Sequence, residues 1–238
     1  MFRPSHDPSV FSAHRALVLA EACRDTYGSH EAFVDKWSHL GSVRSWECGA
    51  TVARGWVTKD HTVICFRGTD DFTDWKRNTS MGRTTLEDYR QVHSGFLAAV
   101  REIAPVLEQD PDIQTSAWLA GHSLGGAIAA ITSALVNLPY ADVEAVYSFG
   151  APRVGDGRWR DMFLDPHFRV VNAGDIVPST PPWLLGYTHQ GTRRVVTHKG
   201  LVKRRQSLWD WISGRIEPGL AHDIDSYVSR LRKHCDPR

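Results

Sequence analysis

Short apolar runs alternate with helical patterns along most of this chain. Residues 94–108 carry large apolar side chains at helical spacing, and residues 124–136 form a second apolar helical segment. Runs typical of buried strands occur at residues 61–66, 117–120, 143–149 and 168–172. This alternation predicts an α/β fold in which a mostly parallel central sheet has helices on both faces. Functional residues are then expected at the carboxyl ends of the strands.

The rest of the sequence is consistent with one domain over residues 1–238. No Pro/Gly/Ser-rich linker, internal repeat or low-complexity tract divides it, and a chain of this length can bury a large core. Further helices and strands are expected at residues 9–27, 43–48, 50–58, 157–164 and 221–232.

Charge and composition exclude several classes of protein. The formal charge is +1, with 28 basic and 27 acidic residues, so nothing draws the whole chain to nucleic acid. The longest N-terminal apolar run, residues 16–20, is too short for a signal peptide or a membrane span. Four cysteines without a CxxC pair indicate no zinc site and no disulfide framework. We therefore expect a cytoplasmic protein, although export routes other than Sec would leave no mark here.

The segment 121–126, GHSLGG, follows a predicted strand and precedes a predicted helix. This G-x-S-x-G pattern in this context predicts a nucleophile elbow, with Ser123 exposed at the start of the helix. Its glycines remove the side chains that so tight a turn excludes. The alternative is a glycine-rich turn with an N-capping serine, as in a phosphate-binding loop, but no lysine follows the glycines as a P-loop requires.

Three further segments accompany the elbow: FRGT at residues 66–69, YSFGAPRVG at 147–155 and DIVP at 175–178. In this order they resemble the class 3 lipases, the fungal triacylglycerol lipases and their relatives, over roughly residues 45 to 232. We interpret the chain as a bacterial-type member. The resemblance implies the α/β-hydrolase fold and carboxylic-ester hydrolysis without a metal or cofactor.

A serine nucleophile needs a base and an orienting carboxylate, which α/β-hydrolases carry in the order Ser, Asp or Glu, His. Asp175 follows the predicted strand 168–172 and resembles the family's triad aspartate, whereas Asp156 fits better as a helix cap. His222 stands in an H-x-x-x-x-Y setting like the family's catalytic histidine, and His189 is its rival. The chain departs from the family in having an alanine before His222.

Two donors must hold the oxyanion of the tetrahedral intermediate. The N–H of Leu124, directly after the nucleophile, is one candidate. By resemblance, Thr69 in the loop after strand 61–66 supplies the other, and the alternative for that segment is an ordinary turn.

In lipases of this family a lid lies between the oxyanion loop and a His-x-Gly-Phe motif, here residues 70–92. Phe72 and Trp75 are its candidate substrate contacts, and plain packing is their alternative role. Four charges crowd the first part of the segment and its apolar residues are widely spaced. Because an interfacial lid needs a broad apolar face, we expect little interfacial activation.

Two features outside the motifs bear on partners. Residues 189–212 hold six basic residues followed by tryptophans, a pattern that favours weak contact with a membrane surface, and a solvated loop ahead of a core-facing helix is the alternative. Cys23 and Cys235 fall where secreted fungal members carry a disulfide, so the resemblance suggests such a bond.

The predicted function is that of a lipase or esterase acting on a small-molecule or lipid ester through Ser123, Asp175 and His222. A thioesterase, acyltransferase or phospholipase would use the same triad, and sequence does not separate these reactions. A non-catalytic binding protein on this fold is a remote third reading, since no triad member is missing.

Overall fold

The computed structural model describes residues 7–69, 82–113, 116–138, 141–199, 202–203 and 218–236. The described residues form an eight-stranded sheet in the order β1-β2-β3-β6-β7-β8-β9-β10, and β4 pairs with β5 separately. The strands are β1 (Ser42–Cys48), β2 (Thr51–Val57), β3 (Thr62–Phe66), β4 (Arg83–Thr85), β5 (Gln91–His93), β6 (Ala117–His122), β7 (Val143–Phe149), β8 (His167–Asn172), β9 (Thr192–Val196) and β10 (Val202–Lys203).

The central strands, from β3 through β9, run parallel, and antiparallel pairs close the sheet at both edges. The predicted mostly parallel sheet is therefore confirmed. Parallel order places the ends of β6 and β8 along one rim, which is where Ser123 and Asp175 follow their strands.

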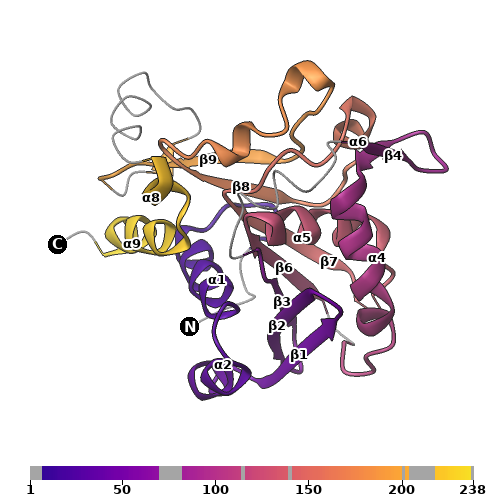
Figure 1. Ribbon diagram of the computed structural model, residues 1–238. Helices are drawn as coiled ribbons and strands as arrows, with labels where there is room; N and C mark the ends of the chain where they lie inside the picture. The colour runs from indigo at the N-terminus through magenta and orange to yellow at the C-terminus, as the bar shows by residue number, and fades with distance from the viewer. Residues whose placement is uncertain are drawn as a thin grey trace.

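Helices cover both faces of the sheet, with α1 and α9 on one side and α4 and α5 on the other (Figure 1). Each side has its own core cluster of buried side chains. The helices are α1 (Ala13–Asp25), α2 (His30–Trp37), α4 (Ser94–Glu108), α5 (Leu124–Leu135), α6 (Gly157–Asp161), α8 (Pro218–His222) and α9 (Ile224–Cys235), with short 3₁₀ helices η1 (Val177–Ser179) and η2 (Trp183–Leu185).

Apolar spacing explains why these segments fold as they do. The predicted apolar face of α4 is buried from Phe96 to Leu107, and every residue of β3 is buried. The expected helix 157–164 ends earlier, at Asp161, and Asp156 caps its start by accepting a hydrogen bond from the Trp159 N–H at 2.9 Å. The capping role predicted for Asp156 is confirmed.

Two segments differ from the sequence prediction. The helix expected over residues 221–232 is broken at Asp223, whose side chain accepts the Asp225 N–H and so starts α9 afresh. The basic stretch after His189, whose alternative reading was a solvated loop, contains strand β9, which pairs with β8 along five residues. Residues 204–212 of that stretch lie outside the described residues.

The four cysteines are free, so Cys23 and Cys235 form no disulfide. Cys23 and Cys65 are both buried, as expected for Cys65 in an apolar strand. No helix in the described ranges combines the length and the apolar character that crossing a bilayer requires.

Buried histidines predict how stability depends on pH. His167 is buried with Nε2 2.8 Å from the Ser148 hydroxyl, and burial lowers its pKa to about 3. The unfolded chain takes up a proton near pH 6.5 whereas the folded chain does not, so stability is lost as pH falls below that value. We expect the free energy of unfolding to fall by about 1.4 kcal/mol per pH unit from this residue.

The variant His167→Gln isolates this effect. Urea unfolding of both proteins between neutral pH and mild acid should show their difference in unfolding free energy shrinking as pH falls. A difference that stays constant over this range would contradict the prediction.

Candidate active site

Ser123 occupies a sharp turn between β6, which ends at His122, and α5, which begins at Leu124. Its backbone has a φ of 55° and a ψ of −125°, a conformation that residues other than glycine rarely adopt. A Cβ at Gly121 would stand 2.1 Å from the carbonyl carbon of Gly125, so only glycine allows the helix to turn back on the strand. The turn places Ser123 at the positive end of α5, as the elbow motif predicts.

The three predicted triad residues converge at the rim of the sheet. His222 Nε2 lies 3.0 Å from Ser123 Oγ, and His222 Nδ1 lies 3.0 Å from Asp175 Oδ2. Since a carboxylate can only accept, Nδ1 carries the proton and Nε2 faces the serine hydroxyl as an acceptor. The side chain of Asp175 is completely buried, and that of His222 is 17% exposed.

Two further groups hold the carboxylate of Asp175. The Val177 N–H donates to Oδ1 at 2.9 Å, and the Tyr227 hydroxyl donates to Oδ2 at 2.6 Å. Burial raises the pKa of Tyr227 well above its ordinary value, and the charge of Asp175 adds to the rise, so this phenol keeps its proton. The hydroxyl oxygen of Tyr227 also accepts a hydrogen bond from the Asn172 N–H at 3.0 Å, which connects the end of β8 to α9.

His122 supports His222 from the other side. Its Nε2 donates to the backbone carbonyl of His222 at 2.7 Å, and its Nδ1 accepts from the Tyr27 hydroxyl, 3.0 Å away. Burial lowers the pKa of His122 to about 3, with a smaller effect from His222, so the ring is neutral. The sequence analysis assigned no role to His122 or Tyr227, although both stand inside quoted motifs, one before the nucleophile and one five residues after the histidine.

The two predicted oxyanion donors lie beside the nucleophile. Leu124 opens α5, where a backbone N–H has no partner within the helix. The loop after β3, the parallel neighbour of β6, also reaches this point, because a Cβ at Gly68 would be 3.4 Å from the Cβ of Ser123. In the next residue, Thr69, the hydroxyl is buried without a hydrogen-bond partner in the described structure. The start of α5 and the loop after β3 therefore meet at Ser123.

Of the other predicted residues, His189 has contacts outside the triad, and the lid residues are not among the described residues. His189 is 2.7 Å from the carbonyl oxygen of Pro178 through Nε2, and burial lowers its pKa well below the ordinary value. It does not pair with Asp175 as His222 does. Phe72 and Trp75, the predicted lid contacts, lie outside the described residues.

Comparison with known proteins identifies relatives of the chain. The sequence profile of the family described as Lipase (class 3) matches residues 63–185. A secreted mono- and diacylglycerol lipase of Fusarium solani is 30% identical over 152 residues, which cover 59% of this chain and 45% of that protein. A lipase of Rhizomucor miehei is 28% identical over 183 residues, covering 68% and 50%. The chain thus spans about half the length of these relatives.

Solved structures agree on the fold. The native complex of Rhizomucor miehei lipase with its propeptide has a TM-score of 0.65 and 22% identity, over 81% of this chain and 71% of that one. Lipase II of Rhizopus niveus has a TM-score of 0.63 and 19% identity, over 78% and 82%. The α/β-hydrolase fold expected from the motifs is confirmed.

Two expectations need correction. The expected cytoplasmic location is wrong, because relatives from Fusarium solani and Penicillium cyclopium are named as secreted lipases. A short apolar run at the N-terminus was too weak a basis for that inference. The bacterial-type interpretation has no support either, since these relatives are fungal and a further one is from Arabidopsis thaliana.

The family profile covers more than half of the 238 residues and includes the turn at Ser123, the loop after β3 and Asp175. The chain therefore belongs to the class 3 lipase family.

Proposed function

We propose that the chain is a serine carboxylic-ester hydrolase that cleaves acylglycerols or related fatty-acyl esters through an acyl-enzyme. The observation that carries the proposal is the unbroken hydrogen-bonded series from Ser123 Oγ through His222 to Asp175, with two spacings of 3.0 Å. A nucleophile, its base and an orienting acid in this order are the working parts of ester hydrolysis by serine enzymes.

In the first step Ser123 Oγ attacks the ester carbonyl while its proton passes to His222 Nε2. Asp175 keeps the imidazole in the tautomer that can accept this proton and stabilises the cation that forms. The strained turn at Ser123 holds the hydroxyl above the sheet, so little reorganisation is needed before attack.

Negative charge then develops on the carbonyl oxygen, and we assign its stabilisation to the Leu124 N–H, the Thr69 N–H and the Thr69 hydroxyl. The Thr69 hydroxyl, which is buried without a hydrogen-bond partner among the described residues, supports this role, because a buried donor without an acceptor is costly unless a ligand uses it. Collapse expels the alcohol with the proton from His222. Water, activated by the same histidine, releases the acid and restores Ser123.

Tyr227 and His122 act as positioning residues in this scheme. Tyr227 donates to the carboxylate that orients the imidazole, and His122 holds the backbone carbonyl of the base itself. Neither contacts the ester.

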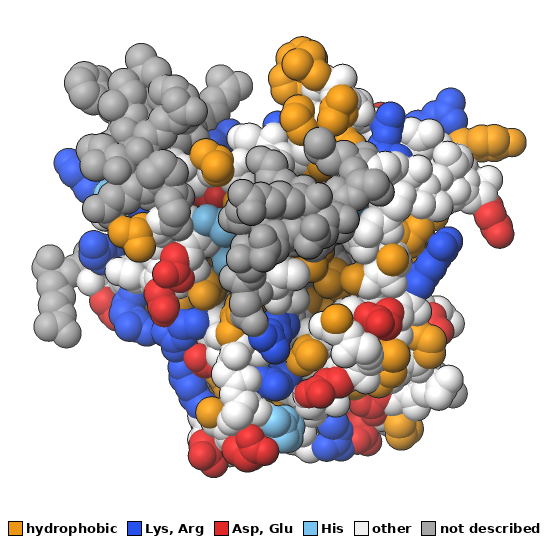
Figure 2. Space-filling view, in the orientation of Figure 1, with side chains coloured by type: hydrophobic (Ala, Val, Ile, Leu, Met, Phe, Trp, Pro, Cys, Tyr) orange, Lys and Arg blue, Asp and Glu red, His pale blue; other side chains and the backbone are white. Residues whose placement is uncertain are grey.

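The substrate class rests on the relatives and on one surface feature. Relatives are named as mono- and diacylglycerol lipases and, in one case, as a phospholipase A(1). Trp183 and Leu184 of η2 are 69% and 75% exposed, and hydrophobic side chains gather over the segment between β8 and β9, at the top of the view in Figure 2. Exposed apolar side chains in the segment that also carries Asp175 favour an amphiphilic ester as the substrate. The secreted relatives favour action outside the cell.

The variant Ser123→Ala should lose at least about 10³-fold in kcat/KM on p-nitrophenyl esters, because the nucleophile is gone. Initial rates on esters from acetate to palmitate check this and locate the preferred chain length. Ser133→Ala, which removes a hydroxyl further along α5, is the matched control and should keep wild-type rates. Equal rates for Ser123→Ala and wild type would rule the mechanism out.

The variant Tyr227→Phe should lower kcat about tenfold with little change in KM, since it removes a donor that orients the base and not a substrate contact. Steady-state kinetics on a soluble p-nitrophenyl ester, which give kcat and KM separately, provide the measurement.

Tyr147→Phe is the control, because it deletes a buried hydroxyl that accepts the Ser12 N–H away from the triad. It should leave both kcat and KM unchanged. If Tyr227→Phe lowered thermal stability while kcat stayed at the wild-type value, its positioning role would be refuted.

A further inference from the structure

The phenol of Tyr27 reaches the active site from the connection between α1 and α2, a segment to which the sequence motifs give no role. Its hydroxyl lies 3.0 Å from His122 Nδ1, and the two rings meet edge-on with their centroids 6.1 Å apart. His122 directly precedes the nucleophile and contacts the backbone of the base. Tyr27 is therefore the next group in the hydrogen-bonded series that ends at His222.

The proton positions in this series follow from the acceptor at its end. The carbonyl oxygen of His222, 2.7 Å from His122 Nε2, can only accept, so Nε2 carries a proton. Burial lowers the pKa of His122 to about 3, so the ring carries a single proton and Nδ1 is an acceptor. The Tyr27 hydroxyl therefore donates to Nδ1. The opposite tautomer of His122 would set two acceptors, Nε2 and the carbonyl oxygen, against each other.

The loop after β3 leaves room for this hydroxyl. A Cβ at Gly68 would stand 2.3 Å from the Tyr27 hydroxyl oxygen and 2.7 Å from the carbonyl oxygen of His122. The Arg67 guanidinium carbon lies 5.7 Å from the centroid of the Tyr27 ring, within range of a cation–π interaction. The phenol is thus packed between His122 and the loop that carries Thr69, and the glycine at position 68 is what lets it reach Nδ1.

A buried arginine holds the backbone on both sides of Tyr27. Arg54, on β2, is 7% exposed, and its Nη1 donates to the carbonyls of Thr26 at 3.0 Å and Gly28 at 2.6 Å. A guanidinium is costly to bury unless its N–H groups are hydrogen-bonded, so these two bonds also stabilise Arg54 itself. The Thr26 hydroxyl adds a bond of 2.7 Å to the carbonyl of Cys23, in the last turn of α1. The position of the Tyr27 backbone is therefore fixed by the sheet and by the helix before it.

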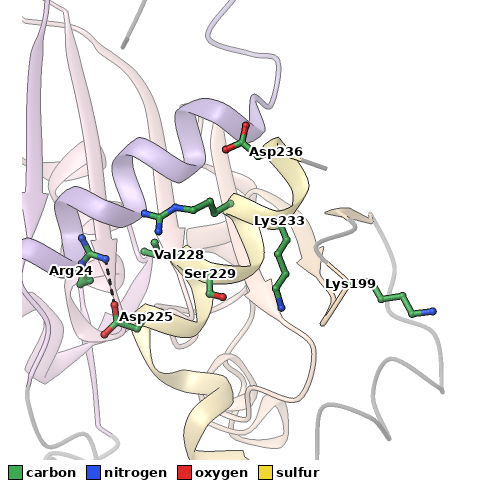
Figure 3. A pocket seen from close by; sticks show the side chains of 8 residues that line it. Arg24, Lys199, Asp225, Val228, Ser229, Lys233 and Asp236 are labelled. Carbon is green, nitrogen blue, oxygen red and sulfur yellow. Dashed lines mark hydrogen bonds and ion pairs between the residues drawn. The ribbon is translucent and has the colours of Figure 1, made fainter. Parts of the chain in front are cut away.

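The end of α1 is also joined to α9, the helix that carries Tyr227. Figure 3 shows Arg24 beside Asp225 of α9, at the edge of a hollow of about 790 Å³, and the two side chains are 3.5 Å apart. Such an exposed ion pair contributes little by itself, but α1 and α9 also bury side chains in one core cluster. Tyr27 and Tyr227 therefore approach His122 from neighbouring elements of one packed layer.

We propose that Tyr27 is a positioning residue for ester hydrolysis: its hydroxyl holds His122 in the tautomer whose Nε2–H fixes the backbone carbonyl of the catalytic base. Without the hydroxyl, Nδ1 would lose its donor in a buried place, and the ring would lose the contact that sets its orientation. A small displacement of the His222 backbone moves the Nε2 of the base relative to Ser123, and proton transfer is sensitive to that distance. The effect on the rate rests on the proposed function, whereas the hydrogen bond does not.

The variant Tyr27→Phe removes the donor and keeps the ring. It should lower kcat on a soluble p-nitrophenyl ester about fivefold and leave KM within about twofold, because the phenol acts on the base and not on the substrate. Tyr147→Phe, which deletes another buried hydroxyl beside α1, is the matched control and should keep both constants. A Tyr27→Phe protein with the wild-type kcat, or one in which KM alone changes, would overturn the positioning role.

A double-mutant cycle tests whether Tyr27 acts through His122. The variant His122→Phe keeps a ring but has neither the acceptor for the phenol nor the donor for the His222 carbonyl. Tyr27→Phe should therefore change kcat by less than about twofold in the His122→Phe background, against about fivefold in the wild type. An equal loss in both backgrounds would mean that Tyr27 acts independently of His122, contrary to the proposal.

Heteronuclear NMR of the imidazole nitrogens at neutral pH observes the hydrogen bond itself. In the wild type, His122 should carry its proton on Nε2, with Nδ1 as an acceptor. The Nδ1 resonance should move downfield in Tyr27→Phe, because it loses its donor, and should stay in place in Tyr147→Phe. A proton on Nδ1 in the wild type would overturn the inference without any variant, and so would an Nδ1 resonance that Tyr27→Phe leaves unmoved. Because this measurement needs no turnover, failure of the inference and failure of the proposed function are distinguished.

Discussion

The buried carboxylate of Asp175 is the charge around which this end of the molecule is organised. Its side chain has no exposed surface, and an unpaired carboxylate in that position would cost several kcal/mol. Donors from Val177, His222 and Tyr227 meet its oxygens from the loop after β8, the end of α8 and the first turns of α9. The bonds that make the buried charge tolerable are therefore the same bonds that orient the base toward Ser123.

Those donors depend in turn on where α9 packs. Tyr227 belongs to the core cluster shared by α1, α9 and the sheet, so apolar packing fixes the position of its hydroxyl relative to Asp175. The Asn172 side chain donates to the Ala221 carbonyl at 3.0 Å, and His122 donates to the next carbonyl, that of His222. The break at Asp223 ends α8 there, which leaves the carbonyl of His222 available to His122 instead of an α-helical N–H. The packing of α9 therefore determines the position of the catalytic base.

Local sequence predicted the parts of this arrangement that follow strands or fill tight turns. Ser123 and Asp175 could be placed because parallel strands end on one rim, and His222 because its setting matched a family motif. Tyr227 as a donor, His122 as a support and the pairing of Arg169 with Arg193 could not be placed, because they depend on helix packing and on the register of β9 against β8. Consecutive arginines carry no apolar alternation, so β9 was not recognised as a strand.

The loop after β8 is held from two sides. On one side the Asp175 carboxylate accepts a hydrogen bond from His222, and on the other Arg153 donates to the backbone carbonyls of Ser179 and Pro181. The position of the orienting acid therefore depends on contacts that the loop makes behind the triad as well as on the base that the acid orients.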